Sequence, residues 1–132
     1  NVLTFEELLA KDKKNLSLKP LKAKALLHGH CHQKAFNVLQ PVENVLKMIE
    51  GLKVETIETS CCGMAGAFGY SKETYKISKE MAEKDLLPQI RQAEKGTILI
   101  ADGTSCRSQI VDGTDENAIH VARLLDKQLT EN

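Results

Sequence analysis

The alternation of apolar and polar residues predicts strands and helices in turn along most of the chain. A short apolar run over 23–27 has the length of a strand, and apolar residues at helical spacing follow between Val38 and Ile49. β-branched residues alternating with charged ones predict a second strand over 53–59. The most apolar short run, 97–101, predicts a third strand.

Two further amphipathic patterns predict helices. One covers about 71–93, and Pro88 is expected to kink this helix or end it early, because proline lacks the N–H that a helix interior requires. The other is the last element of the chain, where apolar residues from Ala118 to Leu129 recur at helical spacing. A short helix is also expected directly after the third strand.

Strands that alternate with helices at this spacing imply right-handed crossovers and a parallel sheet. We therefore expect an α/β fold: a small three-layer domain, Rossmann-like or flavodoxin-like, with a short parallel sheet of about three strands flanked by helices. Residues 1–21 are expected to form a peripheral N-terminal segment, and residues 22–132 the folded domain.

The charge balance and the lengths of the apolar runs limit the classes of partner. Eighteen Lys and Arg residues balance 18 Asp and Glu residues, which argues against nucleic acid as a partner. No apolar run approaches the roughly 18–20 residues of a membrane span, and no signal peptide follows Asn1. We expect a domain of a longer polypeptide in the cytoplasm, or one peripheral to the membrane through a parent complex.

All four cysteines follow predicted strands. Cys31 comes just after the first strand, Cys61 and Cys62 follow the second, and Cys106 lies a few residues after the third. Because the carboxyl ends of parallel strands share one edge of a sheet, we expect the four thiols to meet there. Thiolates bind zinc and iron–sulfur clusters, so metal binding is the favoured interpretation. A thiol–disulfide redox function and inert burial are the alternatives.

The histidines divide into two groups. His30 and His32 flank Cys31 and are candidate catalytic residues, nitrogen ligands or hydrogen-bond donors to a metal site. His28 lies inside the first predicted strand, and His120 opens the last predicted helix. We expect these two to have structural roles.

Glycines and polar residues near the cysteines are candidate cofactor contacts. Gly63 and Gly66 permit a close approach of the backbone to a cofactor. Ser105 and Arg107 flank Cys106. The guanidinium of Arg107 is suited to pair with a carboxylate substrate or with the charge of a cluster, and a solvated surface position fits it equally well.

Three blocks of the chain resemble the cysteine-rich CCG domain. They are His30–Gln33, Cys61–Tyr70 and Ala101–Arg107, and the likeness covers about residues 22–128. That domain occurs in the B subunit of heterodisulfide reductase and in glycolate oxidase iron–sulfur subunits. The sequence looks most like the C-terminal region of fused FAD and iron–sulfur dehydrogenases of the D-lactate or D-2-hydroxyacid type.

The resemblance implies a metal module of a flavin-dependent enzyme that oxidises a small 2-hydroxy acid. It implies an iron–sulfur cluster ligated by Cys31, Cys61, Cys62 and Cys106, with zinc as the alternative metal. It also implies FAD in another domain or subunit, and FAD-binding and ferredoxin-like domains as partners. The module would transfer electrons or line the substrate site, and the fragment alone is expected to be inactive.

One position departs from the family pattern of one Cys, a Cys-Cys pair and a closing Cys-x-x-Cys. Cys106 stands at the first position of the closing pair, and Gln109 stands at the second. The cluster type is therefore open, and a four-ligand site in which His30 or His32 replaces a thiolate is an alternative. A structural zinc or thiol module for packing between domains or subunits is the alternative function. A redox function of the Cys61-Cys62 pair ranks third.

Overall fold

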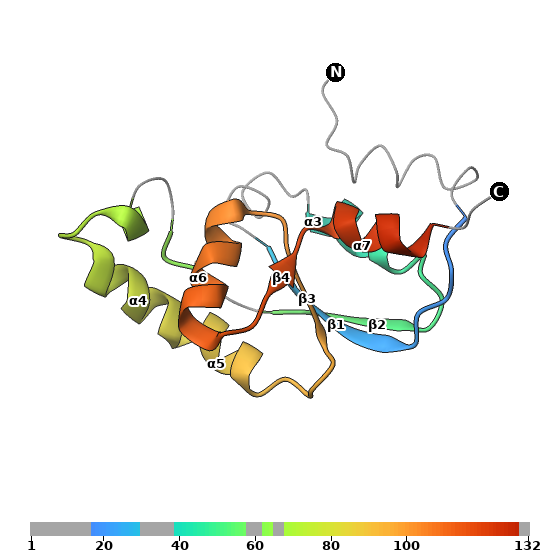
Figure 1. Ribbon diagram of the computed structural model, residues 1–132, viewed down its shortest axis with the longest axis horizontal. Coiled ribbons are helices and arrows are strands. Elements are labelled where there is room, and N and C mark those ends of the chain that lie inside the picture. The colour runs from blue at the N-terminus through green and yellow to red at the C-terminus, as the bar shows by residue number, and fades with distance from the viewer. Residues whose placement is uncertain (1–16, 30–38, 58–61, 65–67, 130–132) are drawn as a thin grey trace, which may run out of the picture.

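The computed structural model describes residues 17–29, 39–57, 62–64 and 68–129. Figure 1 shows the arrangement of its helices and strands. The elements in chain order are β1 (Ala23–His28), α3 (Leu39–Leu46), β2 (Leu52–Thr56), the 3₁₀ helix η2 (Phe68–Tyr70), α4 (Tyr75–Lys84), α5 (Leu86–Arg91), β3 (Ile98–Ala101), α6 (Thr104–Thr114), β4 (Ala118–Ile119) and α7 (Val121–Gln128).

The strands form one parallel sheet in the order β2-β1-β3-β4. In the register, Leu27 of β1 pairs with Thr56 of β2, and His28 pairs with Ala101 of β3. The last residues of the three longer strands therefore lie side by side at one edge. This confirms the predicted α/β fold with a parallel sheet.

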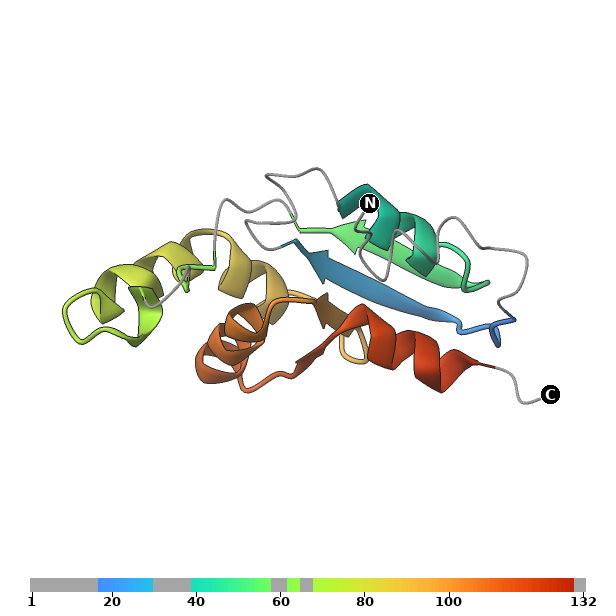
Figure 2. The same cartoon turned by 90° about the horizontal axis from the view of Figure 1, so that it is seen from above.

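Helices cover both faces of the sheet, as Figures 1 and 2 show. Along β3, Ile100 packs into one core, while Leu99 and Ala101 pack into the other, because alternate side chains of a strand point to opposite faces. The core under α3 and α7 consists of Ala25, Leu27, Val42, Val45, Leu46, Ile49, Ile100, Val121, Leu124 and Leu125. The core under α4, α5 and α6 includes Ile57, Ala82, Leu86, Leu87, Ile90, Leu99 and Ile110. The predicted three layers are thus confirmed.

The sheet has a fourth strand that the sequence pattern does not predict. Ala118 and Ile119 pair in parallel with Leu99 and Ile100 of β3, so the placement of Ala118 in the last helix is wrong. A two-residue strand is too short to produce an alternating pattern, and its pairing with β3 decides its conformation. Helix α7 begins at Val121.

The helix predicted over 71–93 is two helices. α4 begins at Tyr75, and α5 begins after Asp85, whose φ of −134° departs from helical geometry. Pro88 is the third residue of α5. A proline ring collides with the carbonyl group four residues earlier, so the interruption falls before Pro88 and not at it.

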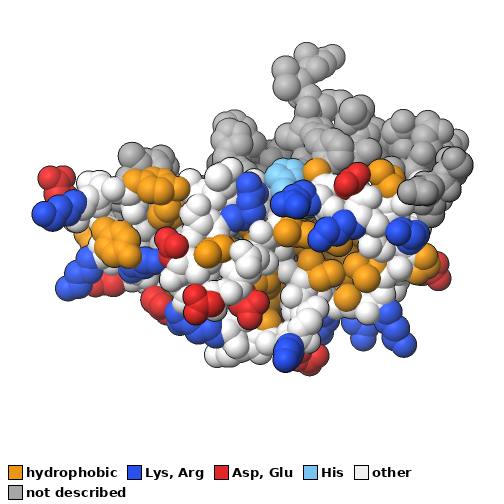
Figure 3. Space-filling view, viewed as in Figure 1, with side chains coloured by type: hydrophobic (Ala, Val, Ile, Leu, Met, Phe, Trp, Pro, Cys, Tyr) orange, Lys and Arg blue, Asp and Glu red, His pale blue; other side chains and the backbone are white. Residues whose placement is uncertain are grey.

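The surface carries both signs of charge. On the face in Figure 3, acidic and basic side chains are interspersed between small apolar areas. Among the described residues, the large apolar side chains with the greatest exposure are Tyr70, Tyr75, Ile77, Met81, Val111 and Leu129. Within the part of the chain that the structure describes, each helix is too short or too polar to cross a membrane.

Gly63 allows the segment after β2 to lie directly against α4. Its φ is +88°, a conformation that favours glycine, and a Cβ atom at this position would collide with the carbonyl oxygen of Ser78. The Ser78 hydroxyl donates a hydrogen bond of 2.6 Å to the Gly63 carbonyl. This contact determines where the backbone of the neighbouring Cys62 lies.

We expect Gly63→Ala to destabilise the chain more than Gly96→Ala does. Gly96 has the same kind of conformation, with φ +89°, but a Cβ atom there meets nothing within 4 Å. Both variants lose about 1–2 kcal/mol from the left-handed backbone. Gly63→Ala should lose a further ~1–3 kcal/mol, because the backbone of α4 must move. Urea denaturation of the metal-free chain measures both values, and equal losses would contradict the close approach.

Candidate metal centre

Three segments that are distant in sequence meet at the carboxyl edge of the sheet. His28 is the last residue of β1, Cys62 follows β2, and Cys106 lies in the first turn of α6, which follows β3. The pairing of His28 with Ala101 places the end of β1 beside the turn that leads into α6. The parallel topology therefore brings the three side chains together.

The side chains form a compact buried group. The sulfur atoms of Cys62 and Cys106 lie 3.3 Å apart, and the ligand atoms of His28, Cys62 and Cys106 all lie within 4.8 Å of one another. The exposed fractions of the three residues are 2%, 5% and 3%. Two thiols and an imidazole are donors that suit zinc or iron, so the chemistry of this set fits a metal centre.

The environment of Cys62 favours its thiolate form. The pKa of Cys62 is lowered from an ordinary value of 9.0 to about 4. The largest cause is the hydrogen bond from Cys106, and burial opposes it because a buried charge loses its hydration. A hydrogen bond from His28, one from the backbone N–H of Met64, and the charge of His28 lower the pKa further. Metals bind thiolates, so Cys62 is prepared for ligation.

Arg107 holds the turn that carries Cys106. Its guanidinium donates to the carbonyl oxygens of Ala101 (2.8 Å) and Asp102 (2.9 Å), and to the hydroxyl of Thr104 (3.2 Å). These bonds tie α6 to the end of β3. Ser105, the other residue next to Cys106, is half-buried in the first turn of the same helix.

The predicted site residues divide into described and undescribed ones. Cys62 and Cys106, 44 residues apart, come together as the position of the cysteines after the strands predicts. Gly63 follows Cys62, and its positive φ allows the backbone there to contact α4. The remaining predicted residues lie outside the described part of the chain: Cys31, Cys61, His30, His32 and Gly66.

The structure places His28 in this group, although the sequence favours a structural role for it. A position inside an apolar strand is typical of a packed histidine, and the residue is indeed buried. However, His28 is the last residue of β1, at the edge where the cysteines lie. The signal available in the sequence is that a polar side chain ends a strand whose next loop carries a cysteine.

His120 has the structural role that its position predicts. It is the N-cap of α7, and its Nδ1 atom accepts a hydrogen bond of 3.0 Å from the backbone N–H of Ala122. Asp102 completes this end of the helix, because its carboxylate accepts a hydrogen bond of 3.0 Å from the backbone N–H of Val121.

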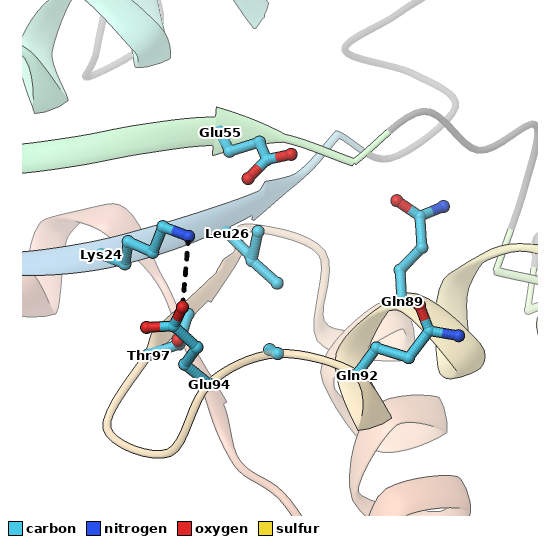
Figure 4. Close-up of a pocket in the computed structure, with 8 residues that line it drawn as sticks. Lys24, Leu26, Glu55, Gln89, Gln92, Glu94 and Thr97 are labelled. Atoms are coloured by element: carbon cyan, nitrogen blue, oxygen red, sulfur yellow. Dashed lines mark ion pairs between the residues drawn. The ribbon is translucent and has the colours of Figure 1, made fainter.

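A separate pocket of about 260 Å³ lies along β1 and β2, close to the end of α5 (Figure 4). It is open and polar, and one ion pair, Lys24–Glu94 at 3.9 Å, crosses it. Both side chains are well exposed, so this pair contributes little stability. The lining contains no sulfur and no histidine, in contrast to the buried group of His28, Cys62 and Cys106.

Comparison with known proteins places the buried group within a matched family region. The family model described as a cysteine-rich domain, CCG, matches residues 25–111, which include all three members of the group. No solved structure matches the chain significantly.

The curated relatives include dehydrogenases and a component of one. A component of the anaerobic glycerol-3-phosphate dehydrogenase of Escherichia coli is 31% identical over 118 residues, which cover 88% of this chain and 29% of that protein. The D-2-hydroxyglutarate dehydrogenase of Pseudomonas putida is 32% identical over 97 residues, which cover 71% of this chain and 9% of that protein. The chain thus spans less than a third of the length of either relative. The family that the motifs resemble is the same family whose model matches residues 25–111. The chain belongs to the CCG cysteine-rich domain family.

Proposed function

We propose that the chain is the metal-binding module of an oxidoreductase that uses flavin and iron–sulfur centres. The observation that carries this proposal is the buried group of His28, Cys62 and Cys106, whose ligand atoms lie within 4.8 Å of one another. A thiol whose pKa is lowered to about 4, beside an imidazole, is more typical of a functional site than of an inert core.

An iron–sulfur cluster is the proposed cofactor. Cys62 and Cys106 would hold it from the described side, and Cys31 and Cys61, which the sequence expects at the same edge, would complete a set of four thiolates. When bound, the cluster supplies electron transfer. The chain's own residues exclude water from the sulfurs, keep Cys62 ionised and fix the positions of the ligands.

The parent enzyme is proposed to oxidise a hydroxyl group on a small acid, such as a 2-hydroxy acid. The relatives are named for glycerol-3-phosphate and D-2-hydroxyglutarate, two anions that carry a hydroxyl group. In this proposal FAD lies in another domain or subunit, and a ferredoxin-like domain exchanges electrons with this module. His30 and His32 are proposed to line the substrate site.

A structural zinc site is the second candidate function. The observation that favours it is the imidazole of His28 beside the two sulfurs, because mixed thiolate and imidazole ligands are common at structural zinc sites. Such a site would hold the carboxyl edge of the sheet together for packing between domains or subunits, and it would take no part in electron transfer.

Anaerobic reconstitution of the full chain with iron and sulfide tests the proposed cofactor. We expect bound iron, bound sulfide and an iron–sulfur absorption spectrum. Cys62→Ser and Cys106→Ser should each remove most of the bound iron, because a hydroxyl is a poor ligand for iron in a cluster. Ser108→Ala, a change on the same helix, is the matched control and should leave the iron content unchanged.

The metal content decides between the two candidate functions. Stoichiometric zinc without bound sulfide would favour the structural site over the cluster, provided that His28→Ala loses this zinc. A chain that binds neither metal under reducing conditions would contradict both functions.

The ionisation of Cys62 predicts a pH-dependent stability of the metal-free chain. Its pKa is about 4 in the folded chain and ordinarily 9.0, so the unfolded state binds more protons between these values. The free energy of unfolding should therefore rise as the pH rises from about 4 to about 9, and this contribution is lost as the pH falls through 4. Urea denaturation over this pH range measures the slope. Cys62→Ser should flatten it, and an unchanged slope would contradict the assignment.

A further inference from the structure

Gln109 is a buried polar residue on the helix that carries Cys106. It lies three residues after Cys106, about one turn along α6, and its exposed fraction is 1%. A buried amide requires hydrogen-bond partners, because an unpaired polar group in the core is costly. Its partners therefore indicate what it does.

The amide of Gln109 reaches two other segments. Its Nε2 atom donates to the carbonyl oxygen of Cys62 at 3.0 Å, and it lies 3.2 Å from the carbonyl oxygen and 3.1 Å from the hydroxyl of Ser78 on α4. The Ser78 hydroxyl in turn donates to the carbonyl of Gly63 at 2.6 Å. Two consecutive carbonyls, those of Cys62 and Gly63, are thus held by side chains from two different helices.

This arrangement links the positions of the two sulfurs. Helix α6 supplies the Cys106 sulfur directly, and through Gln109 it also holds the backbone of Cys62. Cys62 lies in neither a helix nor a strand, and the side-chain bonds to its carbonyl and to that of Gly63 hold it in place. The same helix therefore contacts both members of the 3.3 Å sulfur pair.

We infer that Gln109, anchored by Ser78, is a positioning residue that holds the Cys62 sulfur beside the Cys106 sulfur. The family pattern has a cysteine at this position, whereas here the side chain bonds to the backbone of a neighbouring ligand candidate. The importance of Gln109 for metal binding rests on the proposed function. The effect of Gln109 on the positions of the sulfurs does not depend on the proposed function.

The first test measures metal binding of the full chain with cobalt(II) as the probe. Gln109→Met keeps the volume of the side chain and removes its N–H donors. We expect the affinity for cobalt to fall by about ten- to one hundred-fold, as for other groups that orient ligands. Gln89→Met is the matched control, because the Gln89 amide also donates to a backbone carbonyl, that of Asp85, in a part of α5 that the metal group does not include.

The second test requires no metal. In a chain with Cys31→Ser and Cys61→Ser, oxidised glutathione in a redox buffer takes two electrons and two protons from the thiols of Cys62 and Cys106. A disulfide bond forms between the two cysteines as one oxidised glutathione becomes two molecules of reduced glutathione. The equilibrium constant of this exchange depends on how well the sulfurs are aligned and not on how fast a reagent reaches them, so Gln109→Met should lower it about ten-fold or more. The Gln89→Met control should keep the equilibrium constant of the parent.

Folding is checked by circular dichroism at the assay temperature. If Gln109→Met does not fold, Ser78→Ala takes its place. This change removes the hydroxyl that contacts Gln109 and donates to the Gly63 carbonyl, and it keeps the bond from Gln109 to Cys62. A lower equilibrium constant for the disulfide in the folded variant supports the inference, and a value equal to or above that of the parent overturns it. A parent chain that binds no cobalt would count against the proposed function alone, since the disulfide equilibrium still decides the role of Gln109.

Discussion

The position of the Cys62 backbone against α4 and α6 is the constraint on which the candidate centre depends. A glycine at 63 permits the approach, since any larger side chain would collide with the carbonyl of Ser78. Polar side chains from both helices then fix the carbonyls of Cys62 and Gly63. Without this contact, the sulfur of Cys62 would have no fixed place beside Cys106, and the parallel sheet alone would bring the segments together only approximately.

Burial and hydrogen bonding act in opposite directions at the sulfurs. Removal of water raises the pKa of a buried thiol, because the thiolate loses its hydration. The hydrogen bonds from Cys106, His28 and the Met64 backbone outweigh this effect at Cys62. A buried thiolate with few routes to water is suited to bind a metal ion or cluster and less suited to act as a surface nucleophile. At Cys62, the hydrogen bonds thus determine the ionisation state, and burial limits access to the sulfur.

Some features around the centre have structural roles that their residue types alone do not reveal. Arg107 is a cation next to a candidate ligand, yet its guanidinium donates to backbone carbonyls at the end of β3. Gln109 occupies a position where the family pattern has a thiol, yet its amide bonds to the main chain. In both cases, the side chain fixes the loop or turn that carries a sulfur.

The sequence by itself determined the fold class, because apolar periodicity and the alternation of strands and helices are local properties. It also determined that Cys62 and Cys106 would share an edge, because both follow parallel strands. The interruption of the helix over 71–93 also follows from the sequence, because the ring of Pro88 disturbs the turn before it. The two-residue strand at 118–119 could not be predicted in the same way, since pairing with β3 decides it. The tertiary structure alone decided that His28 joins the sulfurs and that Gln109 bonds to Cys62, because such contacts join residues distant in sequence and depend on how helices pack onto the sheet.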